Sequence, residues 1–419
     1  MKYEVAVIGL GYIGLPTAVL IASKKLNVLG VEVNENVIEK LTAAISHINE
    51  PFLDELLVNV IDNKLLTVRN APSKSKVFVI TVPTPFKDKK NNIPQPDLSY
   101  VDAAMNSISS YIEKGDLIIL ESTIPVGATE RFALELTKIR SDLNLNFKAS
   151  ENIDVNIAHC PERVLPGNIM KEIVENDRIV GGLTKKCSEK ARAFYEKFVK
   201  GKIHETSSKT AELTKLSENS FRDVQIAFAN ELSIICDSAG INVRELISLA
   251  NKHPRVNILQ PGPGVGGHCI AVDPWFIASS YPKESKMIQL ARKVNNEKPA
   301  WVIKKIENQL EKINNNPNKK KITLGFFGLA YKPNIDDLRE SPSLQIAKYF
   351  SKKKNILCKT IEPNISSKEV VPGIENIPLE RALDEIDIAI LLVNHSEFQD
   401  ISQNDYLAIM DFTGVLSNY

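Results

Sequence analysis

A single cysteine stands in a glycine-rich segment in the second half of the chain. The segment spans residues 264–274 and reads Gly-Val-Gly-Gly-His-Cys-Ile-Ala-Val-Asp-Pro, with Cys269 near its centre and Asp273 four residues later. Glycines let the backbone approach a ligand closely and adopt conformations that other residues avoid. The spacing therefore predicts a thiol that is presented to a ligand, whereas a cysteine without such neighbours is ordinarily a small buried residue.

The N-terminus carries a second chemical signal, a glycine pattern that follows an apolar, strand-like run. It reads Gly9-Leu10-Gly11-Tyr12-Ile13-Gly14, the fingerprint of a dinucleotide-binding turn. One glycine makes the tight turn, one lets the pyrophosphate approach the backbone, and one lets the following helix pack against the strand. Glu32 ends the next strand-like run, where a carboxylate accepts hydrogen bonds from the adenosine ribose and repels a 2′-phosphate. The pattern predicts NAD rather than NADP, and the alternative is a glycine turn with no ligand.

Two threonines follow later strand-like runs of the same region. Thr84 stands in Val82-Pro83-Thr84-Pro85, and Thr123 stands in Glu121-Ser122-Thr123-Ile124-Pro125. Ligands of doubly wound sheets bind at the edge where the strands end. We therefore expect Thr84 and Thr123 beside the cofactor, with the alternative that Pro-Thr-Pro only ends a strand.

A redox cofactor combined with a presented thiol indicates an oxidation that ends in an acid. An aldehyde has no hydride to give until a group adds to it, and the Cys269 thiolate could add to form a thiohemiacetal. Loss of a second hydride would give a thioester, which water releases as the acid. Such a site needs donors for the oxyanion and a group that delivers water.

Candidates for these roles lie on one helix and in two other segments. Lys215, Asn219 and Arg222 are four and three residues apart, so they share one helix face. A lysine and an asparagine amide are suitable oxyanion donors, although a helical lysine is more often a solvated surface charge. Glu162 and Asp273 are candidates for handling protons and positioning water.

The composition excludes several classes of protein. The chain of 419 residues is too long for one typical domain, and its net charge of +1 gives no indication of a nucleic-acid or membrane-surface partner. Five scattered cysteines without a CxxC pair do not indicate a disulfide framework or a zinc site, and His268 has no complementary metal ligands around it in the pattern. The chain begins on a strand-like run and contains no apolar run of membrane-spanning length, so we expect a cytoplasmic protein that binds no metal.

The first third of the chain alternates short, nearly continuous apolar runs with amphipathic stretches. This alternation is typical of a parallel sheet that is covered by helices on both faces. The polar segment Phe86–Asp97 reads as an exposed loop. The expected strands are Tyr3–Leu10, Val28–Val33, Val77–Val82, Leu117–Glu121, Asn156–Cys160 and Arg178–Gly181.

The apolar period becomes helical after residue 208 and returns to a strand pattern near residue 322. The expected helices are Lys209–Ala239, which ends at Gly240, Val243–Asn251 and Lys286–Lys312. Asn314–Lys321 reads as a linker, and strand-like runs follow at Ile322–Gly328, Leu357–Glu362 and Ile386–Val393. The sequence thus predicts an α/β protein with two Rossmann-like doubly wound domains, over residues 1–205 and 320–419, joined by a central long-helix region over residues 206–313.

The order of these motifs resembles that of the UDP-glucose/GDP-mannose dehydrogenase family, over almost the whole chain. The resemblance rests on Gly9–Gly14, Val82–Pro85, Cys160-Pro161-Glu162-Arg163, Lys215 with Asn219, the Gly-Gly-His-Cys segment, and Lys332 through Arg339-Glu340-Ser341-Pro342. Residues 161–167, 219–224 and 253–258 look most like the members that act on UDP-N-acetyl-D-mannosamine. The UDP-glucose enzymes usually carry Pro-Glu-Phe-Leu-Arg-Glu at residues 161–166, so a role for that second glutamate cannot be carried over.

The resemblance implies a four-electron oxidation of the sugar C6 alcohol to a uronate with two NAD, as a step toward a surface polysaccharide. Cys269 would be the nucleophile, and Lys215 and Asn219 would stabilise the oxyanion. Glu162, Thr123 and Asp273 would arrange water and protons.

The resemblance also implies binding residues and a partner. Gly9, Gly11, Tyr12, Ile13 and Gly14 would hold the cofactor, with Arg339 near its pyrophosphate. The C-terminal domain would hold the UDP, with Lys332 on the substrate. The substrate pocket would be lined by Arg163, Val164, Arg222, His253 and Gly266. The family dimerises through the central helices, and Arg255 would reach into the partner's site.

Three alternatives stay open at this point. The same reaction on UDP-N-acetylglucosamine, UDP-N-acetylgalactosamine or UDP-glucose would use the same catalytic residues, because contacts to C2 decide the sugar. A two-electron dehydrogenase of the β-hydroxyacid type shares the architecture and has no need for Cys269. A non-catalytic NAD-binding sensor needs no nucleophile, and the set of Cys269, Lys215, Asn219 and Asp273 argues against it.

Overall fold

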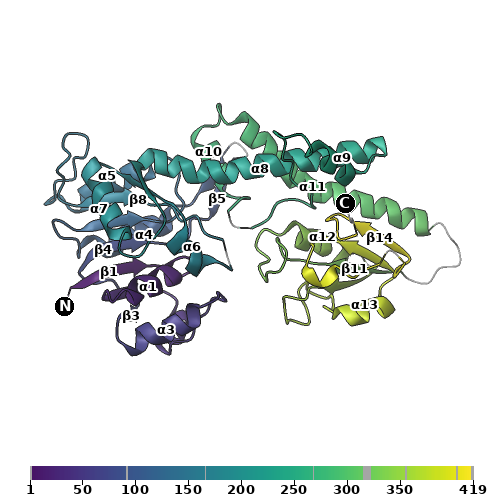
Figure 1. Cartoon of the computed structure of the whole chain (residues 1–419), viewed down its shortest axis with the longest axis horizontal. Helices are drawn as coiled ribbons and strands as arrows, with labels where there is room; N and C mark the ends of the chain where they lie inside the picture. The colour runs from purple at the N-terminus through teal and green to yellow at the C-terminus, as the bar shows by residue number, and fades with distance from the viewer. Residues whose placement is uncertain are drawn as a thin grey trace. The chain divides into compact units, whose positions relative to one another are not determined.

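The computed structural model describes residues 2–90, 93–165, 167–267, 269–314, 322–353, 356–402 and 404–416. The chain forms two compact units, the first comprising Met1–Glu218 with Trp275–Tyr281 and the second comprising Asn219–Pro274 with Pro282–Tyr419 (Figure 1). The boundary falls inside the long helix α8 (Ser208–Ala239). Residues 315–321 of the expected linker lie outside the described residues.

The first unit is built on an eight-stranded sheet with the strand order β10-β9-β8-β7-β4-β1-β2-β3. All neighbouring strands pair in parallel except β8 and β9. The strands are β1 (Tyr3–Ile8), β2 (Val28–Val31), β3 (Leu66–Arg69), β4 (Ser75–Ile80), β7 (Leu117–Leu120), β8 (Asn156–His159), β9 (Arg178–Gly182) and β10 (Ile203–Ser207). The six strands from β3 to β8 follow the order of a dinucleotide-binding sheet, in which the ligand crevice lies between β1 and β4.

Helices cover both faces of this sheet, which confirms the doubly wound prediction. Along β1, Val5 and Val7 pack into one core with α1, α3, α6 and α7, while Ala6 and Ile8 pack into a second core with α4 and α5. Burial on both faces explains why the strands read as nearly continuous apolar runs. The helices are α1 (Gly14–Ser23), α2 (Glu35–Thr42), α3 (Leu53–Asp62), α4 (Ser99–Ser109), α5 (Ala128–Ile139), α6 (Ile169–Glu175), α7 (Lys185–Tyr195) and α10 (Asp273–Ser280).

The segment Phe86–Asp97 is not the exposed loop that its composition predicted. β5 (Phe86–Lys90) pairs with β6 (Ile93–Pro96) in a two-stranded antiparallel sheet. The Phe86 ring also meets the Phe276 ring of α10 edge to face, with 6.0 Å between the centroids. The prediction was wrong because strand formation depends on cross-strand and packing partners more than on the polar composition of the segment.

The second unit contains a four-stranded parallel sheet with the order β12-β11-β13-β14, which confirms a second Rossmann-like domain. Leu324 and Phe326 of β11 pack on one face with α12, and Phe327 packs on the other face with α13. The strands are β11 (Thr323–Phe327), β12 (Leu357–Ile361), β13 (Ile388–Leu391) and β14 (Ala408–Asp411). The helices are α9 (Val243–Ala250), α11 (Lys286–Asn314), α12 (Pro342–Ser351), α13 (Leu379–Glu385) and the short η1 (Ser396–Phe398).

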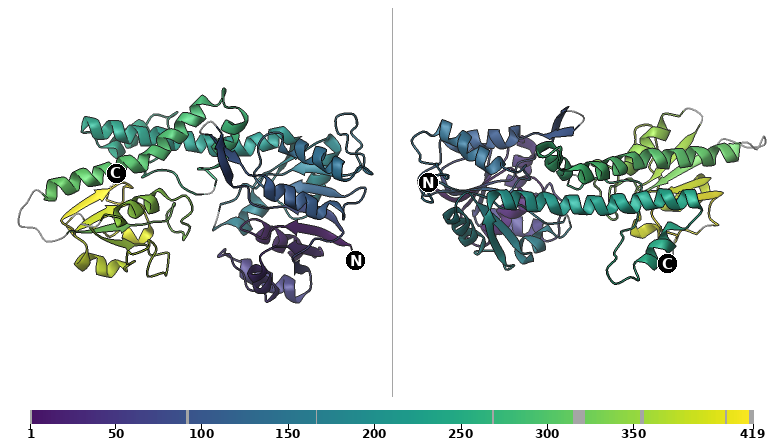
Figure 2. Two further views of the ribbon diagram at one scale, coloured as in Figure 1. Left: turned by 180° about the vertical axis from the view of Figure 1, so that it is seen from behind. Right: turned by 90° about the horizontal axis from the view of Figure 1, so that it is seen from above.

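The long helices α8 and α11 fall where the helical period predicted them. In the second unit, α11 lies alongside the second half of α8 (Figure 2). Two buried polar contacts join them: Arg292 Nη1 lies 2.6 Å from Asp223 Oδ1, and the Asn230 amide donates to Asn295 Oδ1 at 2.9 Å. Buried hydrogen-bonded pairs of this kind fix the register of two packed helices.

The two sheets carry the same turn after their first strand. Gly9 and Gly328 have φ values of +91° and +81°, and their N–H groups donate to the carbonyl oxygens of Val31 and Ile361 at 2.8 and 2.9 Å. A glutamate follows the second strand in each case: Glu32 after β2 and Glu362 after β12.

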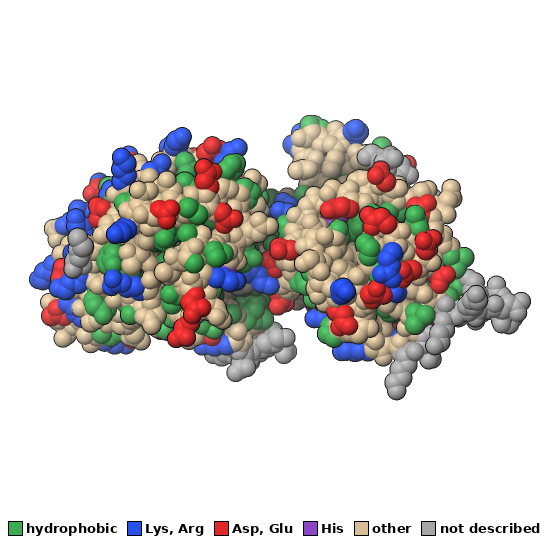
Figure 3. Space-filling model, turned by 90° about the horizontal axis from the view of Figure 1, so that it is seen from below, with side chains coloured by type: hydrophobic (Ala, Val, Ile, Leu, Met, Phe, Trp, Pro, Cys, Tyr) green, Lys and Arg blue, Asp and Glu red, His purple; other side chains and the backbone are tan. Residues whose placement is uncertain are grey.

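Within the described residues, no helix is both long and apolar enough to cross a membrane. Acidic and basic side chains are interspersed on the face drawn in Figure 3, in keeping with the net charge of +1.

Candidate active site

The three glycines of the dinucleotide-binding turn have three different surroundings. Gly9 takes a φ of +91°, a conformation that other residues rarely adopt. A Cβ on Gly14 would lie 1.9 Å from the carbonyl oxygen of Gly9, so only glycine lets α1 start this close to β1. A Cβ on Gly11 would meet no atom within 4 Å. The open space over Gly11 fits the close approach of a pyrophosphate, and the residues present therefore fit a bound dinucleotide.

Glu32 lies against this turn from the end of β2. Its Oε2 accepts a hydrogen bond from the Leu10 N–H at 3.0 Å, and its Oε1 accepts from the N–H groups of Val33 and Asn34 at 2.9 and 3.0 Å. Each carboxylate oxygen has more than one lone pair, so the carboxylate held in this way can still accept from ribose hydroxyls. Glu32 therefore lies next to the glycine turn, and its ribose contact stays a prediction.

Four of the other residues predicted to bind the cofactor, Thr84, Thr123, Tyr12 and Ile13, follow strands of the same sheet at its carboxyl edge. Thr84 follows β4 and is buried, whereas Thr123 follows β7 and is half-buried. Tyr12 is exposed, and Ile13 is half-buried immediately before α1. The neighbouring Thr81 hydroxyl donates to the Gly9 carbonyl at 2.7 Å, so the ends of β1 and β4 are joined next to the glycine turn.

Glu162 is held by a buried cation that the sequence did not single out. Arg178 Nη2 lies 2.6 Å from Glu162 Oε2, and Arg178 Nη1 lies 3.3 Å from Glu121 Oε1. The Tyr195 hydroxyl donates to Glu121 Oε1 at 2.5 Å, and its ring lies under the Arg178 guanidinium with 4.4 Å to the centroid. Arg178, Glu121 and Tyr195 come from β9, the end of β7 and α7, so sequence spacing alone could not bring them together.

Two carboxylates share the single Arg178 cation, and their surroundings differ. Burial above all, with the nearby Glu162 charge, raises the pKa of Glu121 to about 7 against the attraction of Arg178. Burial is the largest single effect on the pKa of Arg178, and it lowers that pKa. The nearby Glu162, Tyr195 and Glu121 together outweigh burial, so the pKa of Arg178 is raised. The cluster therefore keeps a permanent positive charge beside Glu162.

The predicted substrate residues of the first unit lie near α8. Arg163 Nε and Nη2 form a two-point contact with the Glu218 carboxylate at 3.0 and 2.7 Å, and Val164 packs on the sheet core. Lys215 is half-buried on α8. Burial, aided by the Lys215 charge, lowers the pKa of His159 to about 3, so His159 is neutral next to this lysine.

The thiol segment joins two other predicted catalytic residues in the second unit. Cys269 is exposed, and its carbonyl accepts hydrogen bonds from the N–H groups of Val272 and Asp273 at 3.0 and 2.8 Å. The Asn219 amide donates to Asp273 Oδ2 at 2.6 Å, and Asp273 is buried. Cys269, Asp273 and Asn219 are therefore neighbours. His268 lies outside the described residues.

The glycines before Cys269 let the thiol segment rest on the loop that follows β11. A Cβ on Gly266 would lie 2.7 Å from Tyr331 Cβ, and a Cβ on Gly267 would lie 2.7 Å from the Tyr331 ring. The Gly267 N–H donates to the Arg339 carbonyl at 2.9 Å. The predicted substrate residue Gly266 is thus required for close packing as well.

A cavity of about 370 Å³ opens beside this contact, a volume at the small end of the range for ligand pockets. Arg222 of α8 lines it, and the exposed Lys332 lies between two of its other lining residues, Tyr331 and Pro333. Arg339 is exposed and forms a two-point contact with Asp337 at 2.6 to 3.0 Å. The lining residues are Arg222, Ile226, Leu259–Gly264, Tyr331, Pro333, Pro342, Ser343, Leu392–Asn394 and Thr413.

His253 and Arg255 lie on an exposed loop after α9. The Asn251 side chain spans the loop by accepting from the Ile258 N–H at 2.7 Å and donating to the Ile258 carbonyl at 3.0 Å. Both His253 and Arg255 side chains are exposed on the loop that this contact closes. The loop is therefore braced at its base, with its predicted binding residues on the surface.

Models of three domains of one family match the chain in order. The NAD binding domain of the UDP-glucose/GDP-mannose dehydrogenase family matches residues 3–199, the central domain matches residues 209–297, and the UDP binding domain matches residues 325–417.

Individual relatives match over nearly the full length. The UDP-N-acetyl-D-mannosamine dehydrogenase of Campylobacter jejuni is 49% identical over 407 residues, covering 96% of this chain and 97% of the relative. The NDP-N-acetyl-D-galactosaminuronic acid dehydrogenase of Ralstonia nicotianae is 46% identical over 419 residues, covering 99% and 96%. Among solved structures, the UDP-D-ManNAc dehydrogenase of Pyrococcus horikoshii is 36% identical with a TM-score of 0.87, covering 99% of this chain and 96% of that one.

Proposed function

The chain belongs to the UDP-glucose/GDP-mannose dehydrogenase family and is an NAD-dependent UDP-sugar dehydrogenase, and from this premise we propose that its substrate is UDP-N-acetyl-D-mannosamine. The reaction would convert the C6 alcohol of the sugar to a carboxylate. The observation that best supports this oxidation is the exposed Cys269 thiol beside the hydrogen-bonded pair of Asn219 and Asp273. A two-electron enzyme has no use for this thiol.

The choice of sugar is supported by the names of relatives that are similar over the whole chain. Relatives named UDP-N-acetyl-D-mannosamine dehydrogenase are 47 to 49% identical in Campylobacter jejuni, Yersinia pestis and Escherichia coli. A galactosaminuronic acid dehydrogenase is 46% identical in Ralstonia nicotianae. The second candidate is therefore the same oxidation of a UDP-sugar that differs at C2 or C4.

The proposed mechanism assigns the cofactor to the turn at Gly9–Gly14 and Glu32. NAD, when bound there, supplies a hydride acceptor for each of the two oxidations. In the first oxidation a carboxylate, Asp273 or Glu162, takes the proton of the C6 hydroxyl as the alcohol becomes an aldehyde. The Cys269 thiolate then forms a C–S bond to the aldehyde carbon, which places a negative charge on the oxygen.

The remaining steps depend on groups that stabilise this oxygen and deliver water. The Lys215 ammonium and the Asn219 amide donate to the oxyanion, and Asp273 orients the amide through its hydrogen bond at 2.6 Å. Loss of the second hydride converts the adduct to a thioester. Glu162, held by Arg178, and Thr123 position a water that attacks the thioester carbon; the C–S bond breaks and the thiolate leaves.

The decisive experiment measures NADH formed per sugar with limiting UDP-N-acetylmannosamine and, separately, the gluco, galacto and glucose analogues. Two NADH per sugar with the manno compound alone is the expected result. Two NADH with a different sugar would keep the mechanism and replace the substrate. One NADH per sugar, or normal turnover by Cys269→Ser, would contradict the thiol mechanism, because the serine variant should stall at the aldehyde or at a slowly hydrolysed ester.

The partner that we propose is a second copy of the chain. Phe221, Phe228 and Ile235 of α8 are 53 to 66% exposed and stand seven residues apart, so they form one apolar stripe along the helix. Stripes with this spacing bury themselves against a second helix. The dimer would bring Arg255 of one copy to the site of the other.

We also propose that the enzyme works in the cytoplasm and that its product enters a surface polysaccharide. A catalytic thiolate requires a reducing compartment. Among the described residues, all five cysteines are outside disulfides, and Cys160, Cys187 and Cys236 are buried. The product, a nucleotide-activated sugar acid, is a suitable donor for a glycosyltransferase.

A further inference from the structure

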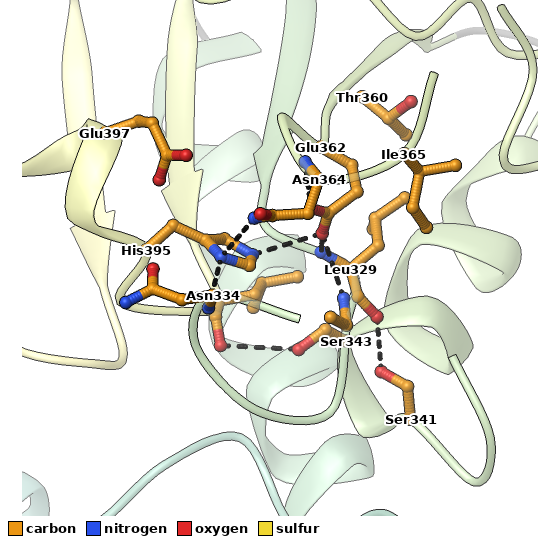
Figure 4. A network of polar contacts seen from close by, with 12 residues as sticks. Leu329, Asn334, Ser341, Ser343, Thr360, Glu362, Asn364, Ile365, His395 and Glu397 are labelled. Carbon is orange, nitrogen blue, oxygen red and sulfur yellow. Dashed lines mark hydrogen bonds and ion pairs between the residues drawn. The ribbon is translucent and has the colours of Figure 1, made fainter. Parts of the chain in front are cut away.

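A fully buried pair of ionisable side chains, His395 and Glu362, lies behind the loop that follows β11 (Figure 4). His395 Nε2 is 3.2 Å from Glu362 Oε2. The same Glu362 oxygen accepts hydrogen bonds from the backbone N–H groups of Leu329 and Ala330 at 2.7 and 3.0 Å. Glu362 therefore fixes the beginning of the segment 329–334.

His395 fixes the other end of this segment. Its Nδ1 accepts a hydrogen bond from the Asn334 backbone N–H at 3.0 Å. Asn334 has a φ of +60° and accepts from the Ser396 N–H through its Oδ1 at 2.9 Å. One histidine–glutamate pair thus holds both ends of a six-residue segment, and neither end is free to move without breaking a buried contact.

The hydrogen bonds determine the form of the imidazole. Nδ1 faces two donors, the Asn334 N–H and the Asn364 amide, each at 3.0 Å, so Nδ1 carries no proton. The proton is then on Nε2 and is donated to the Glu362 carboxylate. Only the neutral imidazole with this tautomer satisfies all the contacts.

The middle of the held segment faces the cavity described above. Tyr331 and Pro333 line that cavity, and so does Asn394, the residue before His395. Tyr331 also supports Gly266 and Gly267 of the thiol segment. The position of segment 329–334 therefore sets one wall of the cavity and the support of the residues before Cys269.

The first unit uses its equivalent glutamate differently. Glu32 also accepts from the N–H that follows the glycine turn, but it is half-buried, and its three hydrogen bonds described above all come from backbone N–H groups. Glu362 is fully buried. Because Glu362 is buried against His395, its carboxylate cannot accept from a ribose, so the equivalent glutamate has a different role in the second unit.

We propose that His395 and Glu362 are positioning residues for the nucleotide of the substrate. They act through segment 329–334 and do not touch the ligand. The inference rests on the proposed function in taking the nucleotide to be UDP, and this is independent of which sugar is oxidised. The consequence is that a change at His395 weakens UDP binding while NAD binding, at the glycine turn, is unaffected.

Two substitutions separate the two contacts of His395. In His395→Asn, Oδ1 is as many bonds from Cα as the histidine Nδ1, so an acceptor for Asn334 N–H remains. In His395→Gln, the glutamine Nε2 is as many bonds from Cα as the histidine Nε2. The donor to Glu362 therefore remains, and the acceptor for the Asn334 N–H is lost. We expect UDP to bind about 3- to 10-fold more weakly to His395→Gln, the equivalent of one lost hydrogen bond, and within about 2-fold of wild type to His395→Asn.

The measurement is calorimetric titration of the full-length protein with UDP and, separately, with NAD. Unchanged UDP affinity in both variants, with only a lower melting temperature, would show that the pair merely stabilises the fold and would overturn the proposal. Equal weakening of UDP and NAD would overturn it as well, because it indicates general loosening.

A second variant covers the case in which His395→Gln does not fold. Asn364→Ala, at a half-buried position, removes one donor to Nδ1 and leaves His395 in place. The proposal predicts about 2- to 3-fold weaker UDP binding with unchanged NAD binding. UDP affinity equal to wild type in this folded variant would contradict it. Failure of the sugar assay would leave these titrations interpretable, because UDP itself is the probe.

Discussion

Glu32 is the residue that we propose to determine which dinucleotide the first unit accepts. Its carboxylate is fixed by three backbone N–H groups at 2.9 to 3.0 Å, so it needs no rearrangement to meet a ribose. We expect Glu32→Ala to bind NAD about 10- to 100-fold more weakly, the equivalent of a lost hydrogen bond to a charged group, and to tolerate NADP better. Titration with both dinucleotides measures the change.

A conservative substitution provides the control for this prediction. Glu32→Gln keeps the size and one acceptor oxygen, so its NAD affinity should lie between wild type and Glu32→Ala. An unchanged ratio of NAD to NADP affinity in Glu32→Ala would mean that this carboxylate does not face the ribose.

Glu121 gives the first unit a specific pH dependence of stability. Burial raises its pKa to about 7 in the folded protein, above the ordinary value of 4.5. As the pH rises from the lower to the higher value, the unfolded chain loses its proton first and the folded state loses stability. Glu121→Gln removes this titration and therefore this loss of stability. The difference in the free energy of unfolding between Glu121→Gln and wild type should therefore grow by about 1–3 kcal/mol, in favour of the variant, from pH 5 to pH 8. Chemical denaturation at several pH values tests this, and parallel curves would contradict it.

Single residues could be predicted where the chemistry lies within one segment. Cys269 and Asp273 are four residues apart, and the glycine-rich pattern around them was sufficient to predict that the Cys269 thiol is exposed. Arg178 and Tyr195 were missed because their partners lie on other strands and helices, and only the folded sheet brings them to Glu162. Glu362 had a detectable signal, since it follows a strand as Glu32 does, but its histidine partner had none.

At the scale of elements, the β1–α1 unit combines a packing glycine with a ligand-facing glycine. A methyl group on Gly14 would overlap the Gly9 carbonyl, whereas one on Gly11 would project into open space. We expect Gly14→Ala to lose at least about 1–3 kcal/mol of folding free energy through overpacking. Gly11→Ala should keep the melting temperature of wild type and bind NAD at least about 10-fold more weakly, because its methyl group occupies the space of the pyrophosphate.

Each of these two variants serves as the experimental control for the other. Melting curves and NAD titrations of both would separate a defect in packing from a defect in ligand approach. A Gly11→Ala protein with full NAD affinity would contradict the assignment of the open space to the cofactor.

Elements were predictable where burial on two faces gave them a strong pattern. The central strands of the first sheet consist mostly of buried apolar residues, and the long helices keep their apolar period for many turns. The β5–β6 pair was not predicted, because its sequence is polar. Its two strands are stabilised by each other and by the contact with α10. β3 and β10 lie at the two edges of the sheet, where a shorter and more polar sequence is tolerated.

At the scale of the whole molecule, the proposed dimer makes the active site a shared structure. In the proposed dimer, the exposed apolar stripe Phe221, Phe228 and Ile235 on α8 packs against the second copy. The exposed Arg255 lies on the loop that Asn251 braces. If Arg255 completes the site of the other copy, two different inactive variants can restore each other's function. Neither variant could do so if Arg255 acted within its own chain.

Co-expression of Arg255→Ala with Cys269→Ser tests this arrangement directly. Each variant alone should be inactive or nearly so. In a mixed dimer, the copy with Arg255→Ala keeps its cysteine and receives the intact Arg255 of its partner, so one of two sites is complete. Because half of randomly formed dimers are mixed, activity should recover to about a quarter of the wild-type level.

Phe228→Glu, which places a charge in the stripe, should abolish the recovery and yield monomers in size-exclusion chromatography. Full dimer formation without any recovery would place Arg255 outside the partner's site, and recovery in the monomeric Phe228→Glu background would show that the site is complete within one chain.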